Sequence, residues 1–290
     1  MGWIKEKLQQ EVLDNIDLTA EITDEELLNT IDRILVQKSK EDYISVQEKR
    51  RMRREIFNSI RRLDILQDLV EDSSITEIMV NGPGYIFIEQ KGKLYPYERS
   101  FESQKKLEDV VQQIVSHSNR IVNEANPIVD ARLADGSRVN VVLPPVAMDG
   151  PVITIRKFPD NPITVEELIR LGSITEEAAL FLKALVVAGY NIFISGGTGS
   201  GKTTFLNVLS NYIPSGERII TIEDSAELQL RNIPNLVRLE VRNANTEGNN
   251  RITIRDLIKT SLRMRPDRRT IINRLNSQKE LIAIPGTFTK

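Results

Sequence analysis

The chain has no cysteine and a single histidine, His117, among its 290 residues. Disulfide bonds and thiolate metal sites are therefore excluded, as is a metal site built from several imidazoles. His117 lies in the polar stretch SHSNR. Without a histidine or cysteine partner it is expected to be an ordinary polar residue.

Long apolar runs are also lacking. The longest, AALFLKALVVAGY, is interrupted by Lys183 and is too short to span a bilayer. The N-terminus, MGWIKEKLQQ, is charged almost at once, unlike a secretory signal peptide, and it has no Ser or Thr at position 6 for myristoylation. We therefore expect a cytoplasmic protein.

Charge of one sign does not dominate the chain. The 39 Lys and Arg residues and 41 Asp and Glu residues leave a formal net charge of -2. This balance argues against a generally basic nucleic-acid binder. Hydrophobic residues make up 40% of the chain, enough to fill a core, and 290 residues suffice for about two domains with a small third.

One glycine-rich signature stands out in what the chain does contain. The stretch SGGTGSGKTT, residues 195–204, holds the pattern G-x-x-x-x-G-K-T. A β-prone run, NIFI, precedes it, and a run with helical apolar spacing, TFLNVLSNYI, follows it. This strand, loop and helix context is typical of a P-loop. Its glycines let backbone N–H groups surround a phosphate, and the helix N-terminus adds further donors.

The P-loop predicts ATP and Mg²⁺ as cofactors. Lys202 is expected to reach the β- and γ-phosphates, and the Thr203 hydroxyl to bind Mg²⁺. The predicted ATP-binding residues are Gly196, Gly197, Thr198, Gly199, Ser200, Gly201, Lys202, Thr203 and Thr204.

A second acidic element is needed beside a P-loop. The stretch RIITIEDSAEL supplies an apolar strand that ends in Glu223 and Asp224, with Glu227 just beyond. Acids at the carboxyl end of such a strand lie where α/β proteins bind ligands. From the residues alone this is a Walker B strand, with Asp224 as a metal ligand. The alternative is an ordinary strand end with exposed acids.

The pattern of apolar and polar residues changes along the chain and indicates several domains. Residues 1–70 predict a helical bundle, because their apolar residues recur at helical spacing. Residues 71–158 predict a small α+β domain, because apolar and polar residues alternate around the turn signals NGPG and KGK. The proline-containing stretch FPDNPIT marks a linker at 159–165, and the P-loop domain occupies 166–290.

A basic cluster lies on one of the predicted helices of the bundle. Its members are Lys49, Arg50, Arg51, Arg53 and Arg54. We favour a solvated face beside acidic helices. A docking patch for an acidic partner, lipid headgroups or nucleic acid is the alternative.

Several stretches resemble the type II/type IV secretion ATPase superfamily and, within it, the CpaF-type ATPase of tight-adherence (Flp) pilus assembly. They are FISGGTGSGKTTFLNVLSNYIP, ERIITIEDSAELQL, ITIRDLIKTSLRMRPDR and RLADGSRVNVVLPPVAMDGPVITIRKF. The resemblance extends from about residue 60 to Arg268. It implies a RecA-like P-loop core, α/β in class, preceded by a PAS-like α+β domain. The implied function is a motor that hydrolyses ATP to drive export of pilin or another substrate.

The resemblance also implies roles for individual residues. TIEDSAE resembles the family's aspartate box, whose glutamate, Glu223 here, is taken to polarise the attacking water. Arginines of the family's N-terminal domain reach the phosphates, and Arg138 in DGSRVNV and Arg156 in ITIRKF match them, with Arg132 a weaker third. Such arginines stabilise charge during phosphoryl transfer.

Family resemblance further implies partners. These ATPases form hexameric rings at the inner face of the cytoplasmic membrane, where they act on a membrane-embedded platform protein. Nucleic acid is not expected as a partner.

The family pattern stops after Arg268. The family places its Walker B strand there, ending in Gly-Glu, and a histidine motif follows. This chain reads RTIINRLNSQKELIAIPGTFTK, with Glu280 as its one acid and with Arg268, Arg269 and Arg274 crowding the segment that should carry the Walker B glutamate. We therefore expect a core that is incomplete at its C-terminus, by truncation, frameshift or true variation. Two functions stay open: the motor ATPase, and a hydrolysis-deficient nucleotide-binding remnant of one.

Overall fold

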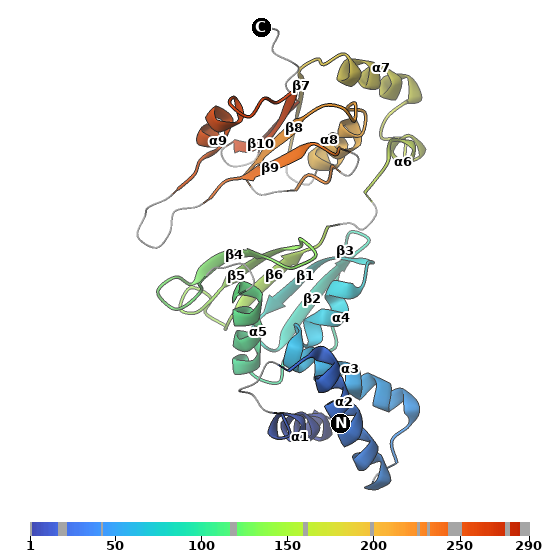
Figure 1. Ribbon diagram of the computed structural model, residues 1–290, viewed down its shortest axis with the longest axis vertical. Coiled ribbons are helices and arrows are strands. Elements are labelled where there is room, and N and C mark those ends of the chain that lie inside the picture. Colours follow the sequence, from blue (N-terminus) through green and yellow to red (C-terminus); the bar gives the residue numbers. More distant parts are fainter. Residues whose placement is uncertain are drawn as a thin grey trace. The chain divides into compact units, whose positions relative to one another are not determined.

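In the computed structural model the chain is described over residues 2–16, 22–41, 43–116, 121–158, 162–197, 200–224, 227–230, 233–242, 251–275 and 279–284. His117 falls outside these ranges. The chain divides into two compact units, residues 1–160 and 161–290, each with a sheet of its own (Figure 1). Within the described ranges, no helix has the length and apolar character needed to cross a membrane.

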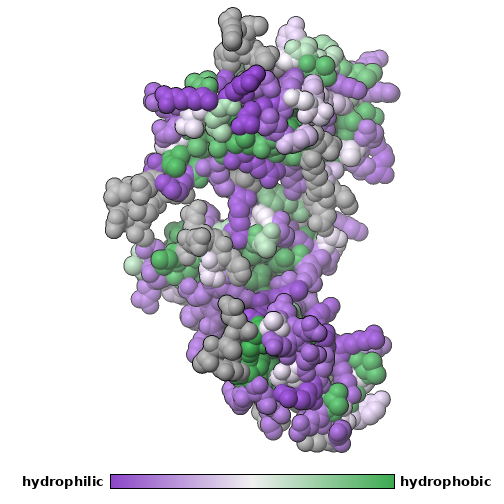
Figure 2. All heavy atoms as spheres, viewed as in Figure 1, coloured by the Kyte–Doolittle hydropathy of each residue, from purple (hydrophilic) through white to green (hydrophobic). Residues whose placement is uncertain are grey.

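The first unit begins with three helices, α1 (Gly2–Asp14), α2 (Asp24–Glu41) and α3 (Val46–Arg61). A capping box starts α3: the Ser45 hydroxyl accepts the backbone N–H of Glu48, whose carboxylate accepts the backbone N–H of Ser45. The helices bury a cluster of their own, made of Leu8, Val12, Leu27, Ile31, Ile34, Leu35, Met52, Ile56 and Phe57. Hydrophilic side chains cover most of their surface on the face seen in Figure 2.

An antiparallel sheet of six strands follows in the order β3-β2-β1-β6-β5-β4. The strands are β1 (Ile75–Asn81), β2 (Tyr85–Gln90), β3 (Lys93–Pro96), β4 (Ile128–Arg132), β5 (Arg138–Val142) and β6 (Val152–Arg156). Helices α4 (Ile65–Glu71) and α5 (Gln104–Ser116) share its core, to which α4 contributes Ile65, Leu66 and Leu69. One face of each strand is buried against these helices, and the alternate residues point away from them.

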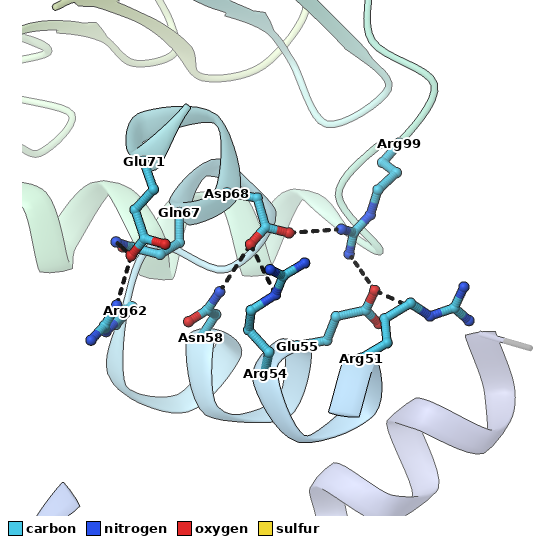
Figure 3. Close-up of polar contacts among 9 residues, drawn as sticks. All are labelled: Arg51, Arg54, Glu55, Asn58, Arg62, Gln67, Asp68, Glu71 and Arg99. Carbon is cyan, nitrogen blue, oxygen red and sulfur yellow. Dashed lines mark hydrogen bonds and ion pairs between the residues drawn. The ribbon is translucent and has the colours of Figure 1, made fainter. Parts of the chain in front are cut away.

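Ion pairs join α3 to α4 and to the segment after β3 (Figure 3). Asp68 of α4 lies 3.4 Å from Arg54 of α3 and 3.4 Å from Arg99. Glu55 of α3 lies 3.3 Å from Arg99 and 3.8 Å from Arg51. Arg99 thus holds two carboxylates on two helices.

These contacts bear on the basic cluster of α3. Arg51, Arg53 and Arg54 each face a carboxylate, those of Glu55, Asp32 and Asp68. The favoured interpretation, a face beside acidic helices, agrees with these three of the five members.

The second unit contains a mixed five-stranded sheet in the order β7-β11-β10-β8-β9. The strands are β7 (Ile192–Gly196), β8 (Ile219–Glu223), β9 (Leu236–Glu240), β10 (Arg268–Leu275) and β11 (Lys279–Ile284), and the helices are α6 (Val165–Arg170), α7 (Glu176–Val187), α8 (Lys202–Ser210) and α9 (Ile254–Ser261). β8 runs parallel to β9 and β10, whereas β11 is antiparallel to β10 and β7. α7 and α8 share an apolar cluster with Ile219 of β8, and α9 packs against Ile220 and Ile222 on the opposite face. This unit is therefore mixed α/β, as predicted.

The segment from Arg268 onward still forms a strand. Arg268, at the start of β10, is the register partner of Ile219, whereas Ile272 is the partner of Glu223. Arg268 therefore lies at the opposite end of β10 from the acidic end of β8, where it pairs with Glu217 and is 4% exposed. All three arginines of the altered segment, Arg268, Arg269 and Arg274, lie on β10. Pairing with β8 places Arg268 a strand's length from Glu223.

Candidate nucleotide-binding site

The P-loop joins β7 to α8, and one of its glycines is required by the backbone. Gly201 caps the start of α8 with φ of +83°, a left-handed conformation that glycine adopts without strain. A Cβ on Gly196 would lie 2.8 Å from Ser200 Oγ, so a side chain there would require the Ser200 hydroxyl to move. Gly197 and Ser200 are exposed. The predicted ligands Thr198 and Gly199 lie outside the described residues.

Lys202 is the first residue of α8, and its side chain turns back over the loop. It is 5% exposed, and its Nζ donates a hydrogen bond to the Gly197 carbonyl. The ammonium thus lies against the loop backbone that would surround a phosphate. Thr203 and Thr204 follow in the first turn of α8, both half-buried.

Glu223 ends β8 with a fully buried carboxylate. Its Oε2 accepts the backbone N–H groups of Glu227, at 2.6 Å, and Leu228, at 3.0 Å. Burial raises the pKa of Glu223, and these two N–H groups act in the opposite direction. The carboxylate therefore holds the backbone at Glu227 and Leu228. Asp224 is exposed at the end of the strand.

Glu227 also contacts the P-loop helix. The Thr203 hydroxyl donates a hydrogen bond of 3.2 Å to Glu227 Oε2. The carboxylate that contacts the predicted Mg²⁺ ligand is thus that of Glu227, to which the sequence assigned no role. The one sequence feature that could have indicated a role for Glu227 is its place among the three acids of TIEDSAE.

Mg²⁺ fits this site only together with a nucleotide. Within the described ranges no three His, Cys, Asp or Glu residues gather closely enough to hold a metal. Mg²⁺ commonly uses one or two protein ligands and completes its shell with phosphate oxygens and water. The Thr203 hydroxyl and nearby acids match that partial set.

The three predicted arginines form one row across the sheet of the first unit. Arg138 of β5 is the register partner of both Arg132 on β4 and Arg156 on β6. Glu77 of β1 pairs with Arg156 in the same row, 3.9 Å away. Directly paired residues point to the same face, here the one away from α4 and α5, and like charges in such pairs are destabilising. The row therefore suits an anionic ligand, although it belongs to a different unit from the P-loop.

Comparison with known proteins was consistent with these features. The family model described as "Type II/IV secretion system protein" matches residues 61–272. An uncharacterized protein of Methanocaldococcus jannaschii is 40% identical over 220 residues, which cover 72% of this chain and 30% of that protein. The type IV secretion system protein VirB11 of Bartonella quintana is 30% identical over 243 residues, which cover 72% of this chain and 68% of that protein. The chain thus spans less than a third of the archaeal relative.

A solved structure was also found. The VirB11 ATPase of the Brucella suis type IV secretion system, crystallised with sulphate, is 26% identical, with a TM-score of 0.35. The match covers 71% of this chain and 66% of that one.

Proposed function

The chain belongs to the type II/IV secretion system protein family, a family of P-loop ATPases, and we propose that it is the ATP-driven motor of a pilus-assembly or secretion system. The observation that carries this proposal is the P-loop itself. Gly201 is left-handed at the start of α8, and Lys202 folds over the loop. The stretches that resemble CpaF-type ATPases support the finer assignment to tight-adherence pili.

Within the site each residue has a proposed task. The loop residues 196–204 hold the phosphates, and Lys202 neutralises charge on the β- and γ-phosphates. Thr203 and Asp224 hold Mg²⁺, and the contact of Glu227 with Thr203 adds a carboxylate beside them. Mg²⁺, when bound, offsets the charge that develops on the phosphates. Glu223 orients a water through Oε1, because Oε2 is already held by two backbone N–H groups.

Arginines from the first unit complete the proposed site. Arg138 and Arg156 would approach the γ-phosphate, with Arg132 beside them in the same row. In a hexameric ring, as the resemblance implies, this sheet face would meet a nucleotide bound to a P-loop. The boundaries 1–70, 71–158, 159–165 and 166–290 remain our proposed domains.

The helices α1–α3 are the proposed attachment to the membrane system. They have their own apolar cluster, and the family model begins to match only at the last residue of α3. We propose that they dock on a platform protein of the inner membrane, so that the motor acts at its cytoplasmic face.

A thermal-shift measurement tests the nucleotide site. Saturating ATP and Mg²⁺ should raise the melting temperature, because a ligand at 100 times its Kd adds about 2.7 kcal/mol. Lys202→Ala should remove most of the shift, whereas Lys259→Ala, at an exposed position on α9, should keep it. Equal shifts in both variants would contradict the assignment.

A second candidate is nucleotide binding with little turnover. It is favoured by β10, which lies beside Glu223 and reads RRTIINRL, without a carboxylate. Losing one preorganised electrostatic group at a reacting centre can cost about 10²–10³ in rate. Steady-state turnover decides between the two candidates. A rate equal to that of a chain carrying the family's Gly-Glu strand and histidine motif would rule out this second candidate.

A further inference from the structure

Three polar side chains are fully buried on the face of the second sheet that packs against α8. Thr221 and Glu223 lie on β8, Thr270 lies on β10, and each is 0% exposed. Ile219, on the same face of β8, packs with Leu206 of α8. The two threonine hydroxyls and Glu223 Oε1 have no hydrogen-bond partner in the part of the chain that the structure describes.

Strand pairing places these three oxygens together. Thr270 is the register partner of Thr221. Glu223 is two residues beyond Thr221, so it points to the same face. The Thr221 hydroxyl is near enough to the Glu223 carboxylate to oppose the effect of burial on its pKa. The three side chains therefore form one buried polar group behind the P-loop helix.

The geometry of this pair limits what can satisfy the two hydroxyls. Directly paired threonines on neighbouring strands can bond to each other, but here neither the Thr221 nor the Thr270 hydroxyl does so. A water molecule between the two side chains can reach both hydroxyls. Buried waters typically make about three hydrogen bonds to otherwise unpaired polar groups. Three such atoms are present here.

We propose that Thr221 and Thr270 hold one buried water molecule that also hydrogen-bonds to Glu223 Oε1. Oε2 is already held by two backbone N–H groups, so this water fixes the second oxygen. Oε1 keeps a second lone pair for a reacting water. Thr270 is then a positioning residue that acts on Glu223 from the neighbouring strand. This consequence rests on the proposed function, whereas the water site itself does not.

Hydrogen exchange of the β8 backbone amides, measured without nucleotide, tests the water site. Thr270→Val keeps the side-chain shape but removes the hydroxyl, and should speed exchange by about tenfold, because a water-bridged hydrogen bond is lost and its partners are left unpaired. Thr270→Ser keeps the hydroxyl and should stay within about twofold of the parent. Thr260→Val, at an exposed position on α9, serves as the control. Unchanged or slower exchange in Thr270→Val would mean a dry site and would overturn the proposal.

The link to Glu223 needs a second comparison. In a Glu223→Leu background the effect of Thr270→Val should shrink, because leucine offers the water no hydrogen-bond partner. Equal effects in both backgrounds would show that Thr270 does not act through Glu223. Thr221→Val should reproduce the pattern if Thr270→Val fails to fold.

A crystal structure gives a direct answer. An ordered water within hydrogen-bond distance of all three oxygens is expected, and three oxygens in contact with apolar atoms alone would overturn the site. Neither measurement uses ATP. A failure of nucleotide binding in the Lys202 test would therefore remove the catalytic meaning of Thr270 and leave the water site standing.

Discussion

Arg268→Met should strongly destabilise the second unit, although the residue touches no part of the nucleotide site. The Arg268 guanidinium forms a two-bond ion pair with Glu217, one bond of which measures 2.7 Å. It also donates to the carbonyls of Val186 and Val187, at the end of α7. The end of α7 and the residue two before β8 are thus joined through one side chain at the start of β10.

The burial of the pair sets the size of the effect. The Arg268 side chain is 3% exposed and that of Glu217 is 25% exposed. Removing one partner of a buried pair costs about 3–5 kcal/mol. Because Glu217 can recover part of its hydration, we expect the lower end, about 3 kcal/mol. The carbonyls of Val186 and Val187 also lose their donor, so we do not expect the loss of unfolding free energy to be smaller than this.

Urea unfolding followed by circular dichroism measures this loss. Tryptophan fluorescence is unsuitable, because the one tryptophan, Trp3, lies in α1 of the first unit. Arg255→Met, at an exposed position on α9, is the matched control and should change stability little. The double variant Arg268→Met with Glu217→Met should recover stability, because replacing both members of a buried pair is often neutral. A loss below about 1 kcal/mol, or a double variant no better than the single one, would refute the reasoning.

Four further outcomes are expected. Deleting residues 1–60 should leave the ATP-dependent thermal shift intact, since α1–α3 bury their own cluster; loss of all folding would show that they belong to the core. Arg99→Ala should cost about 1 kcal/mol or less and speed proteolysis between α3 and α4, because contacts with Glu55 and Asp68 are lost; an unchanged cleavage rate would count against this junction. Glu223→Gln, in a chain carrying the family's Gly-Glu strand, should keep ATP binding and lower turnover by about 10²–10⁴-fold, as for lost general-base assistance; full turnover would return Glu223 to a structural role. The raised pKa of Glu223 means that the folded state favours its protonated form, so the stability that this group contributes is present below the unfolded pKa of about 4.3 and is lost as pH rises through the folded pKa. Without Mg²⁺ and nucleotide, the parent should therefore lose stability relative to Glu223→Gln over that pH range. A stability difference that stays constant with pH would contradict this prediction.

Local structure around the phosphate loop could be predicted because the motif and its flanks are contiguous. The apolar residues of NIFI lie in β7, TFLNVLS lies in α8, and the apolar run before Glu223 forms β8. In each case neighbouring residues carry both the chemistry and the secondary structure. Periodicity and glycine content alone are then sufficient.

Contacts between distant residues could not be predicted in the same way. Thr203 and Glu227 are 24 residues apart, and Arg268 and Glu217 are 51 apart. Each contact depends on tertiary packing or on strand pairing, which no sequence motif specifies. The arginine row shows the same limit: the resemblance named Arg138 and Arg156, but only register shows that Arg132 stands in line with them.

Strand β10 shows that a strand of the fold can form without the side chain that catalysis requires at that position. A strand beside β8 needs only extended, apolar residues, and the stretch TII, where the family match ends, supplies them. Turnover needs more, namely a carboxylate at one register position, and β10 has none. The one acid beyond Arg268 is Glu280 on β11, whose register partner is Gly196 at the entrance to the P-loop. Among the described residues, the further carboxylate that contacts the P-loop helix is that of Glu227, through Thr203. We therefore expect slow turnover, because family membership supplies the loop but β10 lacks the carboxylate that the family resemblance places there.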